Sequence, residues 1–84
     1  MKELRWDDKK SLKLKKERGV SFDEIVLGKF LGIEKNPSRD NQWLVLFEVN
    51  AYVWVIPYVD SGDHFFLKTA FPSRKHTKIY LKRS

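Results

Sequence analysis

The residues best suited to chemistry gather in positions 68–84. This segment contains no acidic residue, and its side chains include six cations, one imidazole and one phenol: Lys68, Arg74, Lys75, His76, Lys78, Tyr80, Lys82 and Arg83. Cations so close together repel one another, and a bound anion would relieve that repulsion. The segment therefore predicts a surface for a polyanion such as a nucleic acid. The alternative is a charged terminus that only keeps a small protein soluble.

The formal net charge of +6 is spread unevenly over the 84 residues. Residues 1–18 carry eight basic and four acidic side chains, residues 19–67 carry three and seven, and residues 68–84 carry six and none. The excess positive charge therefore lies at both ends of the chain, around an acidic middle. If the fold brings the two ends together, they would form one basic surface.

The composition excludes several kinds of site. Without cysteine the chain has no disulfide, no thiolate nucleophile and no cysteine-based zinc site, which fits a reducing compartment. The two histidines, His64 and His76, show no metal-ligand spacing, and the four glycines form no phosphate-binding loop. We therefore expect neither a metal nor another cofactor. The chemistry is left to histidine, lysine, arginine and tyrosine.

The length fits one domain that spans residues 1–84. The N-terminus has no apolar stretch typical of a secretory signal, and Pro57 interrupts the longest apolar run, residues 51–59. That run is far shorter than the roughly 20 residues that cross a bilayer. We expect a cytoplasmic protein with no membrane-embedded segment.

Two helices are expected near the N-terminus. The first should be capped by Asp7 or Asp8 and run through about Arg18, with Gly19 as a natural stop. The second should follow the capping box of Ser21 and Glu24 and continue over residues 22–31. The helical spacing of its apolar residues predicts one buried stripe. The members of this stripe are Phe22, Ile25, Val26, Leu27 and Phe30.

Three strands are expected after a polar loop, over residues 43–49, 52–59 and 64–70, and a short fourth strand around Ile33. The connections between the first three are short enough for hairpins, so these strands should be antiparallel neighbours. The expected fold class is α+β, with the two N-terminal helices packed on a three- to four-stranded antiparallel sheet and followed by a basic C-terminal segment.

The basic segment over residues 73–83 has two interpretations. As a helix it is capped by Ser73 and has three of its lysines on one face. As a strand it alternates Thr77, Ile79 and Leu81 with polar residues. Periodicity does not decide between the two.

The expected sheet has one strongly apolar face. The simplest registers place Val49 opposite Tyr52 and Val59 opposite His64. This face should bury the second helix. Its members are Trp43, Val45, Phe47, Val49, Tyr52, Trp54, Ile56, Tyr58, Phe65, Leu67 and Phe71.

The opposite face of the expected sheet is mixed in character. It combines apolar side chains with a carboxylate, an imidazole and an amine, which belong to Glu48, His64 and Lys68. The C-terminal segment is the nearest chain that could cover this face. We expect it to bring three residues beside Lys68, namely Arg74, Lys75 and His76.

Several stretches resemble BrnT-type toxins. Residues 4–7 (Leu-Arg-Trp-Asp) and 15–24 (Lys-Lys-Glu-Arg-Gly-Val-Ser-Phe-Asp-Glu) are similar to the Trp–Asp opening of that family and to its Lys-rich helix with a Gly-Val-Ser-Phe-Glu-Glu-like turn. Residues 68–75, with Tyr80 downstream, are similar to its small–Ala–Arg segment. Two features differ: Arg18 stands where the family commonly has His, and the C-terminal segment lacks the usual Glu.

The resemblance implies a RelE-like ribonuclease toxin of a type II toxin–antitoxin pair. Its partners would be an RNA substrate and an antitoxin with a small DNA-binding domain, either a ribbon-helix-helix or a helix-turn-helix. RNA can be cleaved without a metal when its own 2′-hydroxyl attacks the adjacent phosphorus. The protein must then place cations near the phosphate and move two protons.

The candidate residues follow from these needs. Arg74 and Lys68 would stabilise the developing charge, His64 or His76 would act as general acid or base, and Tyr80 would donate a proton. The remaining cations would bind RNA: Lys75, Lys78, Lys82 and Arg83. Two alternatives stay open, a non-catalytic nucleic-acid-binding module and a domain whose basic segment binds an acidic protein.

Overall fold

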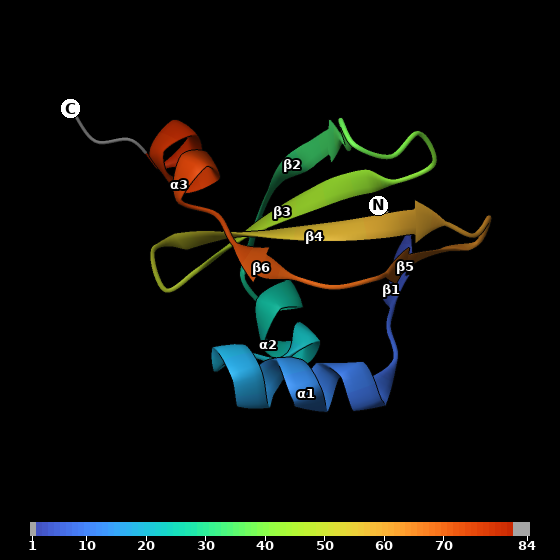
Figure 1. Cartoon of the computed structure of the whole chain (residues 1–84), viewed down its shortest axis with the longest axis horizontal. Coiled ribbons are helices and arrows are strands. Elements are labelled where there is room, and N and C mark those ends of the chain that lie inside the picture. Colours follow the sequence, from blue (N-terminus) through green and yellow to red (C-terminus); the bar gives the residue numbers. More distant parts are fainter. Residues whose placement is uncertain (1, 82–84) are drawn as a thin grey trace.

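The computed structural model describes residues 2–81, and its centre is a six-stranded mixed sheet (Figure 1). The strands are β1 (Glu3–Arg5), β2 (Lys29–Lys35), β3 (Trp43–Val49), β4 (Tyr52–Asp60), β5 (His64–Leu67) and β6 (Phe71–Pro72). Their order is β1-β5-β4-β3-β2, and β6 also pairs with β4. β1 runs parallel to β5, and the other pairs are antiparallel.

The expectation of helices on a three- to four-stranded antiparallel sheet is therefore wrong. The parallel pair arises because the residues before the first helix form β1, where Leu4 lies opposite Phe65 and packs against the core. Three residues are too few to show the alternation typical of a strand. The expected strand over residues 64–70 is also too long, because β5 ends at Leu67 and the chain pairs with β4 again only at β6, beyond residue 70.

The second helix is shorter than expected. α2 (Phe22–Val26) starts at the expected capping box but ends before Gly28. The backbone of Gly28 lies so close to the carbonyl oxygen of Glu48 that a side chain at this position would collide with β3. The chain turns at this contact and continues as β2, with Lys29 opposite Glu48. The helical spacing of residues 22–30 therefore covers two different elements.

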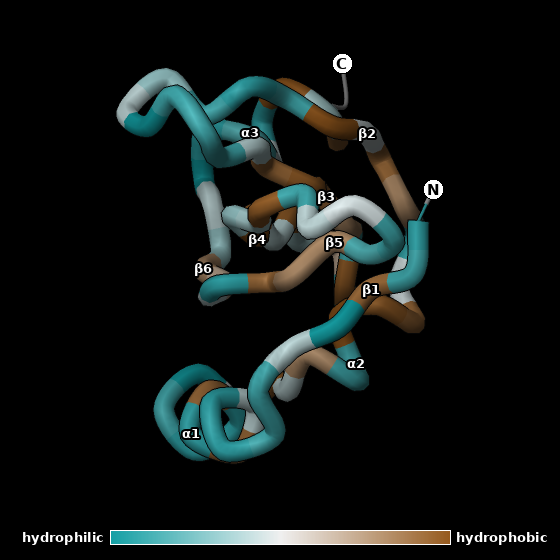
Figure 2. Tube along the Cα trace, turned by 90° about the vertical axis from the view of Figure 1, so that its right-hand side faces the viewer, coloured by the Kyte–Doolittle hydropathy of each residue, from teal (hydrophilic) through white to brown (hydrophobic). Residues whose placement is uncertain are grey.

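α1 (Asp8–Arg18) lies beyond α2, farther from the sheet (Figures 1 and 2). Asp7 caps its start, and Gly19 ends it in the left-handed conformation with φ 86°. Ser11 and Leu14 are its buried residues, and most of its length is hydrophilic (Figure 2). No helix within residues 2–81 is long and apolar enough to cross a membrane.

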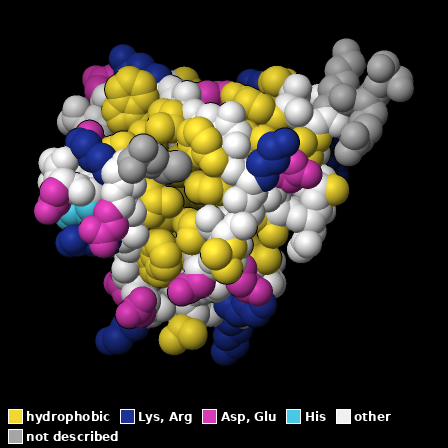
Figure 3. All heavy atoms as spheres, turned by 180° about the vertical axis from the view of Figure 1, so that it is seen from behind, with side chains coloured by type: hydrophobic (Ala, Val, Ile, Leu, Met, Phe, Trp, Pro, Cys, Tyr) yellow, Lys and Arg dark blue, Asp and Glu magenta, His cyan; other side chains and the backbone are white. Residues whose placement is uncertain are grey.

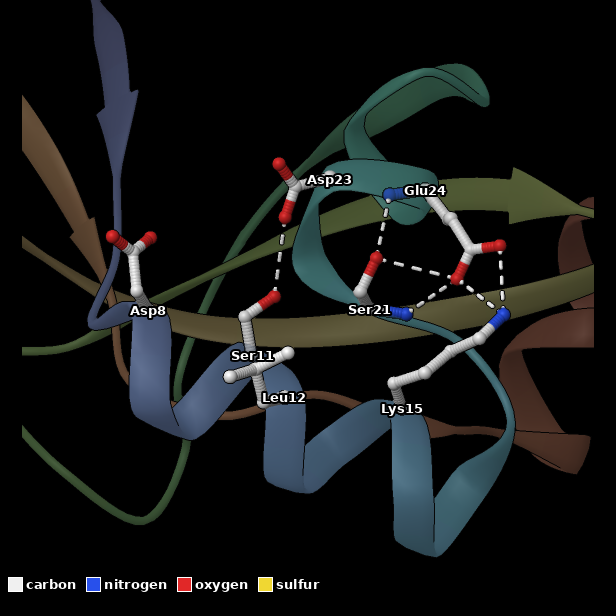
Figure 4. A pocket seen from close by; sticks show the side chains of 7 residues that line it. All are labelled: Asp8, Ser11, Leu12, Lys15, Ser21, Asp23 and Glu24. Atoms are coloured by element: carbon white, nitrogen blue, oxygen red, sulfur yellow. Dashed lines mark hydrogen bonds and ion pairs between the residues drawn. The ribbon is translucent and has the colours of Figure 1, made fainter.

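A polar joint holds the two helices together (Figure 4). The buried hydroxyl of Ser11 accepts a hydrogen bond from the backbone N–H of Phe22 at 3.0 Å. In the capping box, the Ser21 hydroxyl accepts from the Glu24 backbone N–H, and the Glu24 carboxylate accepts from the Ser21 N–H at 2.8 Å. Lys15 of α1 pairs with the same carboxylate at 2.9 Å. The cavity of about 420 Å³ at this joint is lined by Asp8 and Leu12 together with groups that bond to one another, namely Ser11, Lys15, Ser21, Asp23 and Glu24.

The register keeps the expected faces of the sheet. Val49 lies opposite Tyr52, as expected. Val59 lies opposite Phe66 rather than His64, a shift of two residues. Because side chains alternate with a period of two, this shift leaves the side chains of β3, β4 and β5 on their expected faces. The expected place of Phe71 on the core face is wrong, because β6 pairs Phe71 with Val55 on the opposite face.

The two faces of the sheet are buried by different elements. The core face packs against α2 and one residue of α1 through a cluster of buried side chains: Leu14, Phe22, Ile25, Val45, Phe47, Trp54, Ile56, Tyr58, Phe65, Leu67 and Ala70. The opposite face, called the second face below, has a smaller cluster: Leu44, Leu46, Val53 and Val55, covered by Leu31 and Leu81. The C-terminal segment is a helix, α3 (Arg74–Tyr80), on the side of the sheet opposite α1 and α2 (Figure 1).

Candidate functional site

Two polar side chains fix α3 on the sheet. Ser73 caps the helix, because its hydroxyl accepts from the backbone N–H of His76 at 3.1 Å. The hydroxyl of Thr77 accepts from the backbone N–H of Val53 at 2.9 Å and donates to the carbonyl of Ser73 at 2.7 Å. The first turn of α3 is therefore bonded directly to β4, and the side chains of this turn have a defined place over the second face.

α3 and β2 together form a hydrogen-bonded cluster of three titratable side chains, called the Glu34 cluster below. Nε2 of His76 lies 3.1 Å from one carboxylate oxygen of Glu34, and the hydroxyl of Tyr80 donates to the other at 2.7 Å. The two rings stack with their centroids 6.4 Å apart. Nδ1 of His76 lies 2.7 Å from the Ser73 hydroxyl, so both ring nitrogens have a partner. The His76 side chain is 16% exposed and that of Glu34 is 37% exposed, so the carboxylate is the more accessible group.

The cluster shifts the pKa values of Glu34 and Tyr80 in opposite directions. The hydrogen bond from Tyr80, and after it the bond and charge of His76 and the charge of Lys75, lower the pKa of Glu34, although partial burial opposes this. The same hydrogen bond, together with burial and the negative charge of Glu34, raises the pKa of Tyr80. Glu34 is therefore a carboxylate and Tyr80 a neutral phenol near pH 7.

Stability at acid pH gives a direct test of this cluster. A carboxyl group with a lowered pKa in the folded state stabilises the fold above its unfolded pKa, and this contribution disappears as the pH falls through the folded value. We therefore expect the free energy of unfolding of the chain to exceed that of Glu34→Gln at neutral pH, and the difference to shrink as the pH falls below the usual range of a carboxyl group and through the lowered pKa of Glu34. Urea unfolding of both proteins at several pH values measures this difference. A constant difference would contradict the lowered pKa.

Glu34 is the residue that sequence reasoning missed. The sequence predicts only a short strand around Ile33, and no property of one glutamate distinguishes it from other surface acids. Pairing of Glu34 with Leu44 of β3 shows that it lies on the second face, the same face that α3 covers. The sequence held one indirect signal. The C-terminal segment lacks the glutamate that is usual in BrnT-type toxins, and in the structure Glu34 of β2 supplies a carboxylate to this segment.

Lys68 lies on the same face as the Glu34 cluster but not beside it. Its backbone N–H donates to the carbonyl of Pro57 at 2.8 Å, and Pro57 lies opposite Leu44, which lies opposite Glu34. The four residues thus form one row across the second face. Neighbouring strands are about 4.8 Å apart, so three spacings place Lys68 about 14 Å from Glu34 along this row.

Lys68 also lines a pocket at the edge of the sheet, called the cationic pocket below. It has a volume of about 310 Å³ and is lined by Lys10, Asn36, Arg39, Gln42, Pro57, Lys68 and Thr69. Lys10 comes from the basic N-terminal region and Lys68 from the basic C-terminal one. The fold therefore brings one cation from each end of the chain to the same pocket, with Arg39 as a third.

His64 lies far from the Glu34 cluster. α3 begins where Ser73 bonds to Val53 near one end of β4, whereas His64 follows the turn after Asp60 at the other end. The row that contains Glu34 ends at Lys68, and His64 lies four residues before Lys68, so His64 is about 13 Å away from Glu34 along the strands and about 14 Å across them. Nδ1 of His64 is 2.7 Å from a carboxylate oxygen of Asp63. The structure therefore brings His76 and Tyr80 together and leaves His64 apart.

The remaining candidate residues belong to α3 or follow it. Arg74, Lys75 and Lys78 are exposed on this helix, and the charge of Lys75 reaches Glu34. Lys82 and Arg83 lie outside the described residues. Over residues 2–81, no three His, Asp or Glu side chains are close enough together to hold a metal ion.

Comparison with known proteins gives one structural relative. Neither protein-family models nor curated protein sequences include a match to this chain. The crystal structure of the ribonuclease toxin BrnT from Brucella abortus matches it with a TM-score of 0.57 and 12% sequence identity, over 87% of this chain and 97% of BrnT. At this identity the likeness concerns the fold. The resemblance expected from the sequence is confirmed at that level: this chain has a BrnT-like fold.

Proposed function

We propose that this chain is a ribonuclease that cleaves RNA at the Glu34 cluster, without a metal, by attack of the RNA's own 2′-hydroxyl group. One observation carries the proposal: a carboxylate, an imidazole and a phenol share one hydrogen-bonded cluster between β2 and α3, and Arg74, Lys75 and Lys78 are exposed on the same helix. BrnT is a ribonuclease toxin of the same fold. Because a fold can host many functions, the argument rests on the cluster and takes the likeness as support.

The cluster offers a complete path for the protons. The 2′-hydroxyl gives its proton to the Glu34 carboxylate as its oxygen bonds to phosphorus, and Tyr80 gives its proton to the 5′-oxygen as the bond from phosphorus to that oxygen breaks. The proton on Glu34 then returns to Tyr80 along their 2.7 Å hydrogen bond. His76 orients Glu34 through Nε2. The products are a 2′,3′-cyclic phosphate and a 5′-hydroxyl.

The cations of α3 are assigned to the phosphate. Arg74 is the first residue of this helix and is exposed, and its planar guanidinium can donate two parallel hydrogen bonds to phosphate oxygens. Lys75 is near enough to influence Glu34. Both would stabilise the negative charge that builds on the phosphorane, which is usually a large part of such catalysis.

The proposal includes a toxin role and a protein partner. The partner is a small antitoxin with a ribbon-helix-helix or helix-turn-helix DNA-binding domain, encoded beside this chain. Figure 3 shows hydrophobic side chains gathered across the side of the molecule seen from behind Figure 1. At the edge formed by β2 and β3, Phe30, Ile33 and Trp43 are 40–45% exposed. Exposed aromatic and aliphatic side chains in such a group are typical of surfaces that bind another protein.

Incubation of the purified chain with RNA tests the proposal. We expect cleavage in the presence of EDTA, products with a 2′,3′-cyclic phosphate, and a rate that falls about 10- to 100-fold in Arg74→Ala. Arg5→Ala, at the opposite edge of the sheet, removes an equal charge and serves as the matched control. Expression in bacteria should slow growth, and the product of the neighbouring reading frame should restore it.

Two results would contradict the proposal in different ways. If RNA binds in a salt-sensitive manner but stays intact, the chain is a non-catalytic nucleic-acid-binding module. If RNA neither binds at low salt nor is cleaved, the basic segment has a protein as its partner.

A further inference from the structure

The cationic pocket is a preformed feature of the fold. Its three cations come from α1, from the loop between β2 and β3, and from the segment after β5. The loop is closed on itself, because the backbone N–H of Asn36 donates to the carbonyl of Gln42 at 3.2 Å and the Asn36 side chain accepts from the Ser38 N–H at 2.9 Å. Arg39 is thus carried by an ordered loop.

The cations of this pocket have no acidic partner within the described residues. Every ion pair found over residues 2–81 involves other side chains: Lys2–Asp60, Arg5–Glu3, Lys15–Glu24, His64–Asp63 and His76–Glu34. Lys13 and Arg18 of α1 line an adjoining hollow that shares Lys10 and Thr69 with the pocket, and Glu17 is the acid there. Three cations that share a pocket repel one another, so a bound anion would stabilise this arrangement.

The position of the pocket indicates which anion fits. Lys68 and Glu34 belong to one row across the second face, about 14 Å apart by strand spacing. A stacked strand of nucleic acid advances about 3.4 Å per nucleotide, so this distance corresponds to roughly four stacked nucleotides and to about two when the strand is extended. Lys68 is also held in place, because its ammonium lies 5.6 Å from the centre of the Phe66 ring.

We infer that the cationic pocket is a subsite for one backbone phosphate of the RNA, two to four nucleotides from the phosphate that is cleaved at the Glu34 cluster. This inference rests on the proposed function and adds a position to it. The pocket contacts backbone rather than bases, so it sets where the strand lies and which minimum length is cleaved efficiently, and it leaves base preference to other contacts.

A scan with neutral phosphates tests the subsite. RNA strands with one cleavable linkage each carry a single methylphosphonate, placed at successive positions up to five nucleotides on either side of that linkage. We expect one position to raise KM about tenfold, because a charged hydrogen-bonded contact is lost there, while the other positions more than one nucleotide from the linkage have small effects. In Lys68→Ala and Arg39→Ala the same position should have no further effect. Lys16→Ala, on α1 but outside the pocket, is the matched control and should keep the pattern of the unmodified chain.

The outcomes separate this inference from the proposed function. Equal effects at all positions, or an effect that persists in Lys68→Ala, would overturn the subsite while cleavage itself remains. If the chain cleaves no RNA, the proposed function fails. In that case the scan measures the affinity for non-cleavable strands with 2′-deoxyribose at the linkage. Weaker binding at a single methylphosphonate position, with no such effect in Lys68→Ala, would still support a phosphate site in the pocket. Equal affinities at all positions would overturn the phosphate site.

Discussion

RNA cleavage by Glu34→Gln is expected to fall by about 10²–10⁴-fold, with the affinity for a non-cleavable RNA within about twofold of that of the unmodified chain. The amide keeps the size of the side chain and can still accept the hydrogen bond from Tyr80, but it cannot take the proton of the 2′-hydroxyl. The change should therefore appear in kcat and not in binding. Single-turnover cleavage and fluorescence anisotropy with a 2′-deoxy strand measure the two quantities.

Glu48→Gln is the matched control for this prediction. Glu48 lies on the same face of the sheet and carries the same group, but among the described residues the hydrogen bonds of His76 Nε2 and of the Tyr80 hydroxyl go to Glu34 and not to Glu48. Equal losses in both variants would show that a general loss of negative charge, not proton transfer at Glu34, lowers the rate. The two histidines offer a second comparison, since loss of His76 should lower cleavage more than loss of His64.

Phe22→Ala is expected to remove a large part of the stability of the fold. The Phe22 ring is fully buried, lies 5.8 Å from the ring of Trp6, and joins α2 to the core face of the sheet. Truncation of a buried phenylalanine costs about 3–5 kcal/mol, and a domain of this size has roughly 4–12 kcal/mol of total stability. Thermal unfolding followed by circular dichroism should show a fall in Tm of roughly 15–35 °C or no folded state at all.

Leu27→Ala is the control for Phe22→Ala. It also replaces an apolar side chain at α2 by alanine, but it removes no buried contact. Leu27 follows α2 directly and is 85% exposed, although its sequence position predicts a place on the buried stripe. Its truncation should change the free energy of unfolding by less than about 0.5 kcal/mol. A large loss in this variant would mean that the buried stripe continues past Val26, in disagreement with the end of α2.

The starts of the first two helices follow from the sequence because they depend on neighbours along the chain. Residues 73–83 also fit a strand by periodicity, and only the structure shows that Ser73 caps a helix. Asp7, Ser21 and Ser73 each accept a hydrogen bond from a backbone N–H two or three residues ahead, so the residue type at one position determines the start. The β3–β4 hairpin also depends on neighbours along the chain, because a short turn at Asn50 and Ala51 joins its two strands.

The end of α2 does not follow from the sequence. The apolar spacing over residues 22–30 fits a helix, and nothing local forbids its continuation. What ends the helix is the contact of Gly28 with the carbonyl of Glu48, twenty residues later. The stretch beyond it then becomes β2, and pairing with β3 places Glu34 on the second face. The same limit applies to β1, whose three residues become a strand only through β5.

By itself, the sequence determined the cationic character of the C-terminal segment, the starts of the first two helices, the hairpin, the two unlike faces and the resemblance to BrnT. These depend on residue types and on spacings of a few positions. The tertiary structure alone decided that Glu34 meets His76 and Tyr80, which are 42 and 46 residues away, and that Lys10 and Lys68 line one pocket. Contacts over such separations depend on strand order and register, because packing of the whole sheet, and not local preference, selects which side chains meet.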